Sequence, residues 1–284
     1  MAKITNNWSI EEDKKVLLDA VRGAADIAMD YYKRDDLESW DKSENNPVTE
    51  ADLAVDKYLQ KCLTRNRPEY GWLSEETEDN PDRLKCKRVW IIDPIDGTRA
   101  FMRGGDDWGI SAALAYKGKP VLAAFYAPAQ DAFYTAEAGK GAFKNGEKIT
   151  VSEGNNLSDA LMMGCADAFK SASLWPIPWP NGLRFKQQNS IGLRLAQIAD
   201  GQADCCVSLR PKCEWDIAAA DLIIREAGGL ITDGHGHLFA YNQKKPICAH
   251  VVASNRILYS EVLSHFIPAM QRWIKERGEP NCHA

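Results

Sequence analysis

Two carboxylates, Asp93 and Asp96, stand three positions apart at the end of an apolar run, in a segment that reads DPIDGT. Carboxylates with few His or Cys residues nearby suit a hard cation such as Mg²⁺. Pro94 removes one backbone donor and stiffens the turn, so both side chains and a carbonyl oxygen between them can be directed at one point. The N–H groups of Gly97 and Thr98 follow, and they can hold a phosphate if a helix starts there.

Further carboxylates fall at the ends of other segments. Glu75 and Glu76 follow a short apolar run, and Asp216 opens a helical pattern. Taken singly, each acid is typical of a helix cap or a solvated turn, but DPIDGT directly after a buried strand is a much rarer string than its parts. Two or more metal ions held by such a set activate water and neutralise a leaving oxygen. These residue types therefore predict hydrolysis of a phosphate ester.

The helices that must position these acids are indicated by capping signals and by apolar residues at helical spacing. Ser9 caps a predicted helix that runs to about Arg34, and Thr49 caps a second one. The polar stretch between them, residues 34–47, is predicted to be a loop. A final amphipathic helix is expected after a cap at Asn255.

Strands are predicted where short apolar runs lie between turn residues. Residues 89–92 form one such run, and the Pro and Gly of DPIDGT predict that regular structure stops after it. Three runs near 109–116, 121–126 and 132–136 predict an antiparallel sheet. In the second half of the chain strands and helices alternate, which predicts an α/β arrangement. Residues 173–182, rich in Pro and Trp, are predicted to be a surface loop.

Composition disfavours several classes of protein. The 284 residues include 35 Lys and Arg against 40 Asp and Glu, a net charge of -5, whereas a dominant nucleic-acid binder would carry a basic excess. No apolar stretch of about 18 residues exists, so no membrane span is predicted, and the lack of an apolar signal core favours a cytoplasmic protein. The eight cysteines form no C-x-x-C pair, and most of them are expected to be small buried residues.

Four segments resemble, in the same order, those of the inositol monophosphatase superfamily of Mg²⁺-dependent, lithium-sensitive phosphatases. The resemblance implies an α/β fold, the layered α-β-α-β-α sandwich. It implies an N-terminal α+β part, residues 1–150, that carries most metal ligands, and a C-terminal α/β part, residues 151–284, that supplies Asp216 and substrate contacts. The segments are NPVTEAD (46–52), WLSEE (72–76), WIIDPIDGT (90–98) and EWDIAAA with EAGG (214–220 and 226–229).

The resemblance also implies two or three Mg²⁺ ions as cofactors. The first would be held by Glu75, Asp93 and the carbonyl oxygen of Ile95. The second would be held by Asp93, Asp96 and Asp216. Glu75 would also touch a weaker third ion.

Roles in catalysis and phosphate binding are implied in the same way. Asp52 and Thr98, together with Glu75, would serve the water that attacks phosphorus, and the N–H groups of Gly97 and Thr98 would bind the phosphate. Glu76 would lie behind the metal ligands or be solvated. Phosphoryl transfer needs mainly positioning and charge neutralisation. The implied reaction is therefore a single hydrolytic step without a covalent phosphoenzyme.

The segment PKCEWD, which ends at Asp216, resembles the P-x-x-E-W-D form of 3'(2'),5'-bisphosphate nucleotidases. Inositol phosphatases place an acidic residue seven positions before that Asp, and Leu209 stands there in this chain. Arg210 and Lys212 would favour an additional anionic group on the substrate, although ordinary surface charge explains them equally well. The expected substrate is 3'-phosphoadenosine 5'-phosphate or a close relative.

Other functions stay open at this point. Inositol 1-phosphate and histidinol phosphate are alternative substrates for the same chemistry. A non-catalytic protein that binds a partner through the same fold is the alternative of another class, but a degenerate relative should have lost at least one of the acids. Proteins of the superfamily are commonly homodimers, so a homodimer that acts on a small phosphomonoester, with no nucleic-acid or membrane partner, is expected here.

Overall fold

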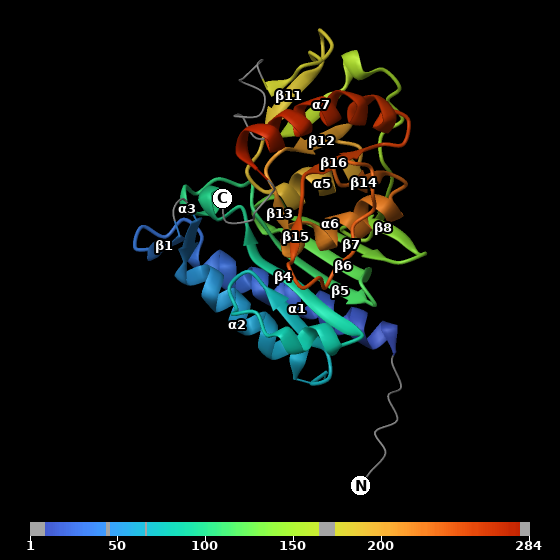
Figure 1. The fold of residues 1–284 in the computed structure, drawn as a ribbon. Coiled ribbons are helices and arrows are strands. Elements are labelled where there is room, and N and C mark those ends of the chain that lie inside the picture. The colour runs from blue at the N-terminus through green and yellow to red at the C-terminus, as the bar shows by residue number, and fades with distance from the viewer. Residues whose placement is uncertain (1–8, 44–45, 66, 165–173, 279–284) are drawn as a thin grey trace.

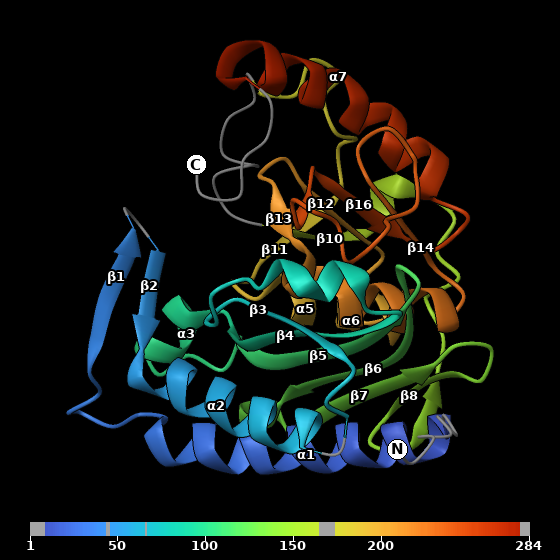
Figure 2. The ribbon, with the colours of Figure 1, turned by 60° about the horizontal axis from the view of Figure 1, so that its bottom comes forward.

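Helices and sheets alternate in five layers, in the order helix, sheet, helix, sheet, helix (Figure 1 and Figure 2). The structure is a computed structural model, and it describes residues 9–43, 46–65, 67–164 and 174–278. Helices α1 and α2 cover the outer face of the larger sheet, α5 and α6 lie between the two sheets, and α7 covers the outer face of the smaller sheet. The layered sandwich that the resemblance implied is therefore confirmed.

The first layer consists of α1 (Ile10–Tyr31) and α2 (Glu50–Thr64). Both predicted caps are confirmed, since the hydroxyl of Ser9 accepts a hydrogen bond from an N–H of the first turn of α1, and Thr49 forms a capping box with Asp52 at the start of α2. The apolar faces of both helices pack against the larger sheet, which removes their apolar side chains from water.

A β-hairpin occupies the stretch that was predicted to be a loop. Strand β1 (Ser39–Ser43) pairs antiparallel with β2 (Asn46–Thr49), and the hairpin stands beside α3 at one end of the larger sheet (Figure 2). The prediction was wrong because every residue of β1 is exposed. Such a strand lacks the alternation of apolar and polar residues that marks a half-buried strand.

The larger sheet has seven strands within the described residues, in the order β3-β4-β5-β6-β7-β8-β9. β3 runs parallel to β4, and the other neighbouring pairs are antiparallel. The three runs predicted to form an antiparallel sheet are β5, β6 and β7, so that prediction is confirmed. The bounds are β3 (Gly71–Ser74), β4 (Arg88–Asp96), β5 (Gly109–Tyr116), β6 (Lys119–Ala127), β7 (Ala132–Glu137), β8 (Gly141–Lys144) and β9 (Glu147–Ile149).

Strand β4 continues past the point where the sequence predicted its end. Its pairing with β5 is irregular between Asp93 and Asp96 and skips Pro94, which has no N–H to donate to a strand ladder. The irregularity therefore lies where the Pro predicted a break, but the strand itself extends to Asp96. Gly97 then takes a left-handed φ of 99°, and the short helix α3 (Thr98–Met102) begins.

The smaller sheet has five strands within the described residues, in the order β11-β10-β12-β16-β14. β10 lies parallel to β11 and β12, whereas β16 is antiparallel to β12 and β14. A separate ladder joins β13 to β15 at the start of α6. The bounds are β10 (Leu161–Gly164), β11 (Arg184–Gln187), β12 (Cys205–Ser208), β13 (Lys212–Cys213), β14 (Leu230–Thr232), β15 (Ile247–Cys248) and β16 (Val251–Ser254).

Helices α5 (Ile191–Ala199), α6 (Glu214–Glu226) and α7 (Tyr259–Arg277) complete the second half of the chain. α7 begins later than its predicted cap. The side chain of Asn255 accepts from the N–H of Leu258 at 2.9 Å, so this residue closes the turn that precedes the helix. Asn255 therefore does accept a capping hydrogen bond, but α7 itself begins only at Tyr259.

Residues 174–182 contain no strand and no α-helix, as the predicted loop requires, and Ser173 lies outside the described residues. Trp175 is nevertheless buried and packs against Phe266 of α7, with the ring centroids 6.3 Å apart. The prediction of a surface loop was wrong for Trp175, because its burial against α7 removes the large apolar surface of the ring from water.

One continuous apolar core fills the layer between the sheets, and it joins Phe125 of the larger sheet, Met163 of the smaller sheet and Ile217 of α6. The division of the chain into two parts at residue 150 stays a prediction. No helix in the part of the chain that the structure describes is long and apolar enough to cross a membrane. The described cysteines are Cys205, Cys206, Cys213 and Cys248, which are buried, and Cys62 and Cys86, which are partly buried; Cys165 and Cys282 lie outside the described residues.

Candidate active site

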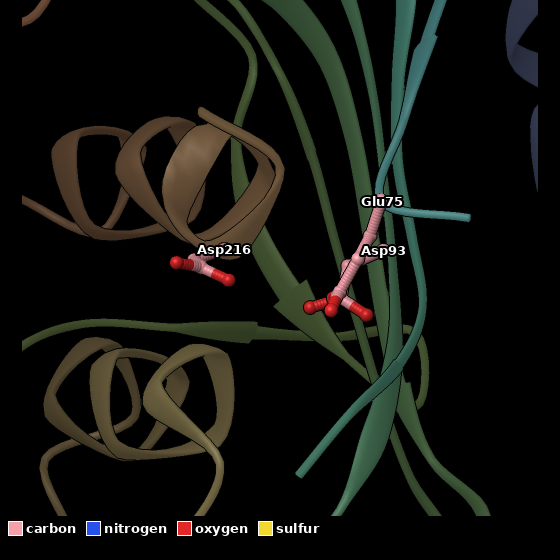
Figure 3. Close-up of side chains that lie close together, drawn as sticks. All are labelled: Glu75, Asp93 and Asp216. Atoms are coloured by element: carbon pink, nitrogen blue, oxygen red, sulfur yellow. The ribbon is translucent and has the colours of Figure 1, made fainter. Parts of the chain in front are cut away.

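Three carboxylates from three elements meet at one point (Figure 3). Glu75 follows β3, Asp93 lies in β4, and Asp216 lies in the first turn of α6; one oxygen of each is within 4.8 Å of the others. Asp93 Oδ1 is buried and accepts no hydrogen bond from a described residue. A set of hard oxygen donors with an unsatisfied buried member fits a divalent cation such as Mg²⁺.

The topology of the larger sheet explains why two of these acids are neighbours. β3 and β4 are parallel, and the last residue of β3, Ser74, pairs with Ile92. The next residues along both strands are therefore Glu75 and Asp93, at the same edge of the sheet. The N–H of Glu75 also donates to the carbonyl oxygen of Ile92 at 3.3 Å. Asp216 arrives from the other half of the chain at the start of α6 (Figure 3).

The electrostatics of the cluster favour a bound cation. Burial is the main cause that raises the pKa of Asp93 well above its usual value, and the neighbouring carboxylates raise it further. Burial likewise raises the pKa of Asp216 to about 7, against the opposing charge of Lys212. A divalent ion among these oxygens would stabilise their ionised forms and lower these pKa values.

Asp96 faces the same cavity but is held from the other side by the start of α5. Asp96 Oδ2 accepts from the hydroxyl of Ser190 at 2.5 Å and from the N–H of Gly192 at 2.6 Å, and Oδ1 accepts from the N–H of Ile191 at 3.2 Å. Burial raises the pKa of Asp96, and these hydrogen bonds oppose that rise. A side chain at Gly192 would lie 2.4 Å from the ring of Phe125 and 2.8 Å from Asp96, so the close approach requires glycine.

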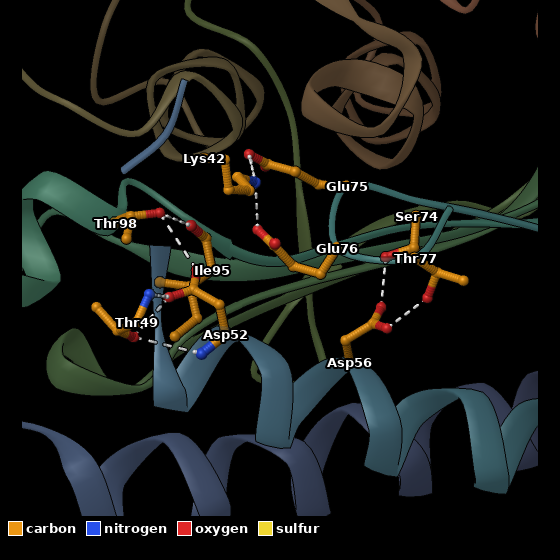
Figure 4. Close-up of polar contacts among 10 residues, drawn as sticks. All are labelled: Lys42, Thr49, Asp52, Asp56, Ser74, Glu75, Glu76, Thr77, Ile95 and Thr98. Atoms are coloured by element: carbon orange, nitrogen blue, oxygen red, sulfur yellow. Dashed lines mark hydrogen bonds and ion pairs between the residues drawn. The ribbon is translucent and has the colours of Figure 1, made fainter. Parts of the chain in front are cut away.

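Asp52 and Thr98 form a second pair beside the cluster (Figure 4). The hydroxyl of Thr98 lies 3.3 Å from Asp52 Oδ1 and 3.1 Å from the carbonyl oxygen of Ile95, so its single proton serves either acceptor. Asp52 Oδ2 accepts from the hydroxyl and the N–H of Thr49, which fixes the carboxylate at the start of α2. Burial raises the pKa of Asp52 to about 6.

Lys42 is a site residue that the sequence analysis missed. Its ammonium lies 3.0 Å from Glu75 and 2.7 Å from Glu76 (Figure 4). Burial alone would lower the pKa of Lys42, but the two carboxylates raise it above its usual value. The Glu76 side chain is only 3% exposed, so it is not solvated, and this burial is the main cause that raises its pKa to about 7. The residue carried no signal because it stands in the stretch that was predicted to be a loop.

A cavity of about 180 Å³ contains most of the predicted site. Asp52 is not part of its wall, and its carboxylate lies 3.3 Å from the hydroxyl of the wall residue Thr98. Asn189 and Arg99 are wall residues that the sequence analysis did not single out. The lining residues are Asn46, Pro47, Glu75, Asp93, Ile95, Asp96, Gly97, Thr98, Arg99, Asn189 and Asp216.

The two cations proposed to contact substrate lie outside this wall. Lys212 is half-buried in β13, and its charge lowers the pKa of Asp96 and of Asp216, so it acts on the cavity from its edge. Arg210 is exposed, and its carbonyl oxygen accepts from the hydroxyl of Ser208. Leu209, 3% exposed, belongs to the apolar core under α7 and offers no group to a substrate.

The sequence profile of the inositol monophosphatase family matches residues 9–270. The chain is 33% identical over 241 residues to the 3'(2'),5'-bisphosphate nucleotidase CysQ of Haemophilus influenzae, covering 82% of this chain and 88% of that one. It is 30% identical over 263 residues to Nus factor SuhB of Pasteurella multocida, covering 88% and 93%. The solved IMPase of Thermotoga maritima matches with a TM-score of 0.77 at 28% identity, over 92% of this chain and 98% of that one. Other relatives are named inositol-1-monophosphatase and histidinol-phosphatase.

Proposed function

The chain belongs to the inositol monophosphatase family, and on this basis we propose that it hydrolyses 3'(2'),5'-bisphosphate nucleotides with the help of Mg²⁺. Proteins of this family are phosphatases, and the chain is a phosphoric monoester hydrolase. One observation carries the proposal: oxygens of Glu75, Asp93 and Asp216 converge in a cavity that is also lined by Gly97 and Thr98. The cavity thus joins donors for a hard cation to N–H groups for a phosphate.

The proposed metal ligands are those that the family resemblance implied. Glu75, Asp93 and the carbonyl oxygen of Ile95 would hold one Mg²⁺. Asp93, Asp96 and Asp216 would hold a second. Bound there, Mg²⁺ supplies positive charge that promotes ionisation of water and neutralises the leaving oxygen. The hydrogen bonds from α5 orient the Asp96 carboxylate for this task, as outer partners of metal ligands commonly do.

Thr98 and Asp52 are proposed to orient the attacking water. When the Thr98 hydroxyl donates to Asp52, its oxygen lone pairs are left to accept a hydrogen bond from a water in the cavity. That water then presents its own lone pair toward phosphorus. Asp52, whose pKa is about 6, is ionised at pH 8 and can take up the proton that the water loses. Hydrolysis proceeds in one step, without a covalent phosphoenzyme.

The scissile phosphate is proposed to bind at Gly97 and Thr98. Gly97 has the left-handed φ that turns the chain from β4 into α3, and a side chain there would lie 2.8 Å from the carbonyl oxygen of Asp107. The charge of Lys212 lowers the pKa values of Asp96 and Asp216. We therefore propose that Lys212 contacts the substrate near these two acids.

The choice of a bisphosphate nucleotide rests on three observations. The PKCEWD segment resembles bisphosphate nucleotidases, and a relative at 33% identity carries that name. Leu209, at the position of the acidic residue of inositol phosphatases, is buried in the core. Arg210 and Lys212 are proposed as additional contacts for an anionic substrate. Inositol 1-phosphate and histidinol phosphate are the alternative substrates, and a non-catalytic, partner-binding role is the outcome that would contradict the proposal.

Phosphate release tests the proposal directly. The panel is 3'-phosphoadenosine 5'-phosphate, inositol 1-phosphate, histidinol phosphate and fructose 1,6-bisphosphate, each with Mg²⁺, with EDTA, and with added lithium. We expect Mg²⁺-dependent, lithium-sensitive release with preference for the nucleotide. Preference for inositol 1-phosphate would assign the chain to the inositol phosphatase branch of the family. A folded protein that releases phosphate from none of the four substrates would favour the partner-binding role. We also propose a homodimer, which light scattering tests as twice the mass of the chain.

A further inference from the structure

A second cavity adjoins the candidate active site between the β1–β2 hairpin and α3. Its volume is about 260 Å³. Pro47 and Arg99 line both cavities, so a ligand in the first can extend into the second past these two residues. The lining residues are Asp41, Pro47, Arg99, Met102 and Arg103.

The side of α3 that faces this cavity carries positive charge, and contacts on the other side of the helix hold it in place. Phe101 on its other side is buried and packs edge-on against Trp108, with the ring centroids 4.7 Å apart. The hydroxyl of Tyr32 donates to backbone carbonyl oxygens just beyond the helix. Arg99 and Arg103, four positions apart, are exposed on the side that these contacts leave open. A segment whose backbone is held in place by these contacts therefore presents two guanidinium groups to one cavity.

The charges on the wall select the kind of group that fits. Arg99 and Arg103 outnumber Asp41, so the wall is cationic on balance. A guanidinium offers paired N–H donors that match the oxygens of phosphate, sulfate or carboxylate. Met102, 39% exposed, lies between the two arginines in sequence and offers an apolar contact to a non-charged part of the same ligand.

We propose that the second cavity binds a second anionic group of the substrate, held by Arg99 and Arg103, while the scissile phosphate lies among the acids of the first cavity. The inference rests on the proposed function and deepens it. Arg103 lies about 6 Å along the helix from Arg99, and Arg99 directly follows Thr98. Arg99 thus lies next to the proposed phosphate site and lines both cavities, so one small molecule such as a nucleotide can place an anionic group in each. Arg210 and Lys212, which are not among the residues that line either cavity, would then contact other parts of the anionic substrate than this second group.

Two matched substrates isolate the second anionic group. Adenosine 3',5'-bisphosphate, which is the 3'-phosphoadenosine 5'-phosphate named above, and adenosine 3'-monophosphate share the scissile phosphate. They differ only in the 5'-phosphate. The measured quantity is the ratio of their kcat/KM values. We expect Arg103→Gln to lower this ratio about tenfold through the KM of the bisphosphate, since a lost charge-assisted contact costs about one factor of ten. The double variant with Arg99→Gln should lower it further, and Arg103→Lys should restore part of it.

Controls separate this subsite from the chemistry. Arg272→Gln, on the outer helix α7, should leave both substrates unchanged. A ratio that stays within about twofold in the Arg103 and Arg99 variants, with both substrates still hydrolysed, overturns the subsite and leaves the phosphatase intact. A fall of the ratio in Arg210→Gln or Lys212→Gln, but not in Arg103→Gln, moves the second anion to those residues.

A binding measurement keeps the inference testable if the proposed function fails. If neither nucleotide releases phosphate with Mg²⁺, the failure concerns the function. Calorimetric titration of adenosine 3',5'-bisphosphate into the wild-type protein and into Arg103→Gln then tests the subsite alone. An affinity that falls about tenfold in the variant supports it, and equal affinities, or no binding to the wild type, overturn it.

Discussion

The hydroxyl of Thr98 lies 3.3 Å from a carboxylate oxygen of Asp52, although the two residues are 46 positions apart in the chain. The pair links the first turn of α2 to the first turn of α3. Asp52 is only 1% exposed and is held by Thr49, so its orientation is set before any substrate arrives. We expect a base and a hydroxyl in this arrangement to act as one unit toward a water in the cavity.

The unit should show strong non-additivity. We expect Thr98→Ala and Asp52→Asn each to lower kcat about a hundredfold, since each removes one part of the same proton relay. The double variant should be little worse than either single variant. Thr98→Ser, which keeps the hydroxyl, should retain most of the activity. Rates measured under saturating Mg²⁺ decide the matter, and multiplicative losses in the double variant would show that the two residues act separately.

Asp93 is expected to be the most sensitive metal ligand, because both proposed ions share it. Asp93→Asn should lower kcat at least about a hundredfold, since a neutral amide supplies less charge to the ions. The exposed Asp36→Asn is the matched control and should be unaffected. Circular dichroism must confirm that the variant is folded. Near wild-type turnover of Asp93→Asn would contradict the proposed mechanism.

Gly192 is expected to be intolerant of a side chain. In Gly192→Ala the new carbon would lie 2.4 Å from Phe125 and 2.8 Å from Asp96, so backbone or ring must move, at a cost of about 1–3 kcal/mol. Ser190→Ala is the comparison that adds no atom, although it removes both the hydrogen bond to Asp96 and the cap that the Ser190 hydroxyl gives to the N–H of Leu193. Urea unfolding of both variants measures the difference in stability. A Gly192→Ala protein as stable as the wild type would show that α5 can withdraw from Asp96.

Stability without metal should fall as pH rises. Burial raises the pKa of Asp216 from its ordinary 3.8 to about 7. An acid with a raised folded pKa binds more protons when folded, so its contribution to stability is complete below pH 3.8 and is lost as pH rises through 7. Thermal unfolding in EDTA across this window should be less steeply pH-dependent in Asp216→Asn than in the wild type. If the unfolding temperatures of the two proteins depend equally on pH, the group with the raised pKa is not Asp216.

Mg²⁺ should reverse this trend. Binding requires the buried carboxylates to lose their protons, so the stabilisation by a fixed Mg²⁺ concentration should grow between pH 6 and pH 8, about the pKa of Asp216. Melting temperatures with Mg²⁺ and with EDTA at each pH give the shift. A shift that is the same at both pH values would indicate that the ion binds without displacing protons.

The sequence by itself determined the local parts of this protein. The order of Asp93, Pro94 and Asp96 after an apolar run located the irregular end of β4, and Thr49 with Asp52 located the start of α2. Alternating runs and turn residues located β5, β6 and β7. Caps, turns and strands depend on residues a few positions apart, so a local pattern carries them.

The tertiary structure alone decided which of these parts meet. Lys42 reaches Glu75 from a hairpin with no apolar alternation, and Ser190 donates to Asp96 across 94 positions of the chain. The cavity that Arg103 lines exists only because the hairpin lies beside α3. Such contacts follow from the register of the strands and the packing of five layers on shared apolar cores. They are properties of the whole chain, and no single segment encodes them.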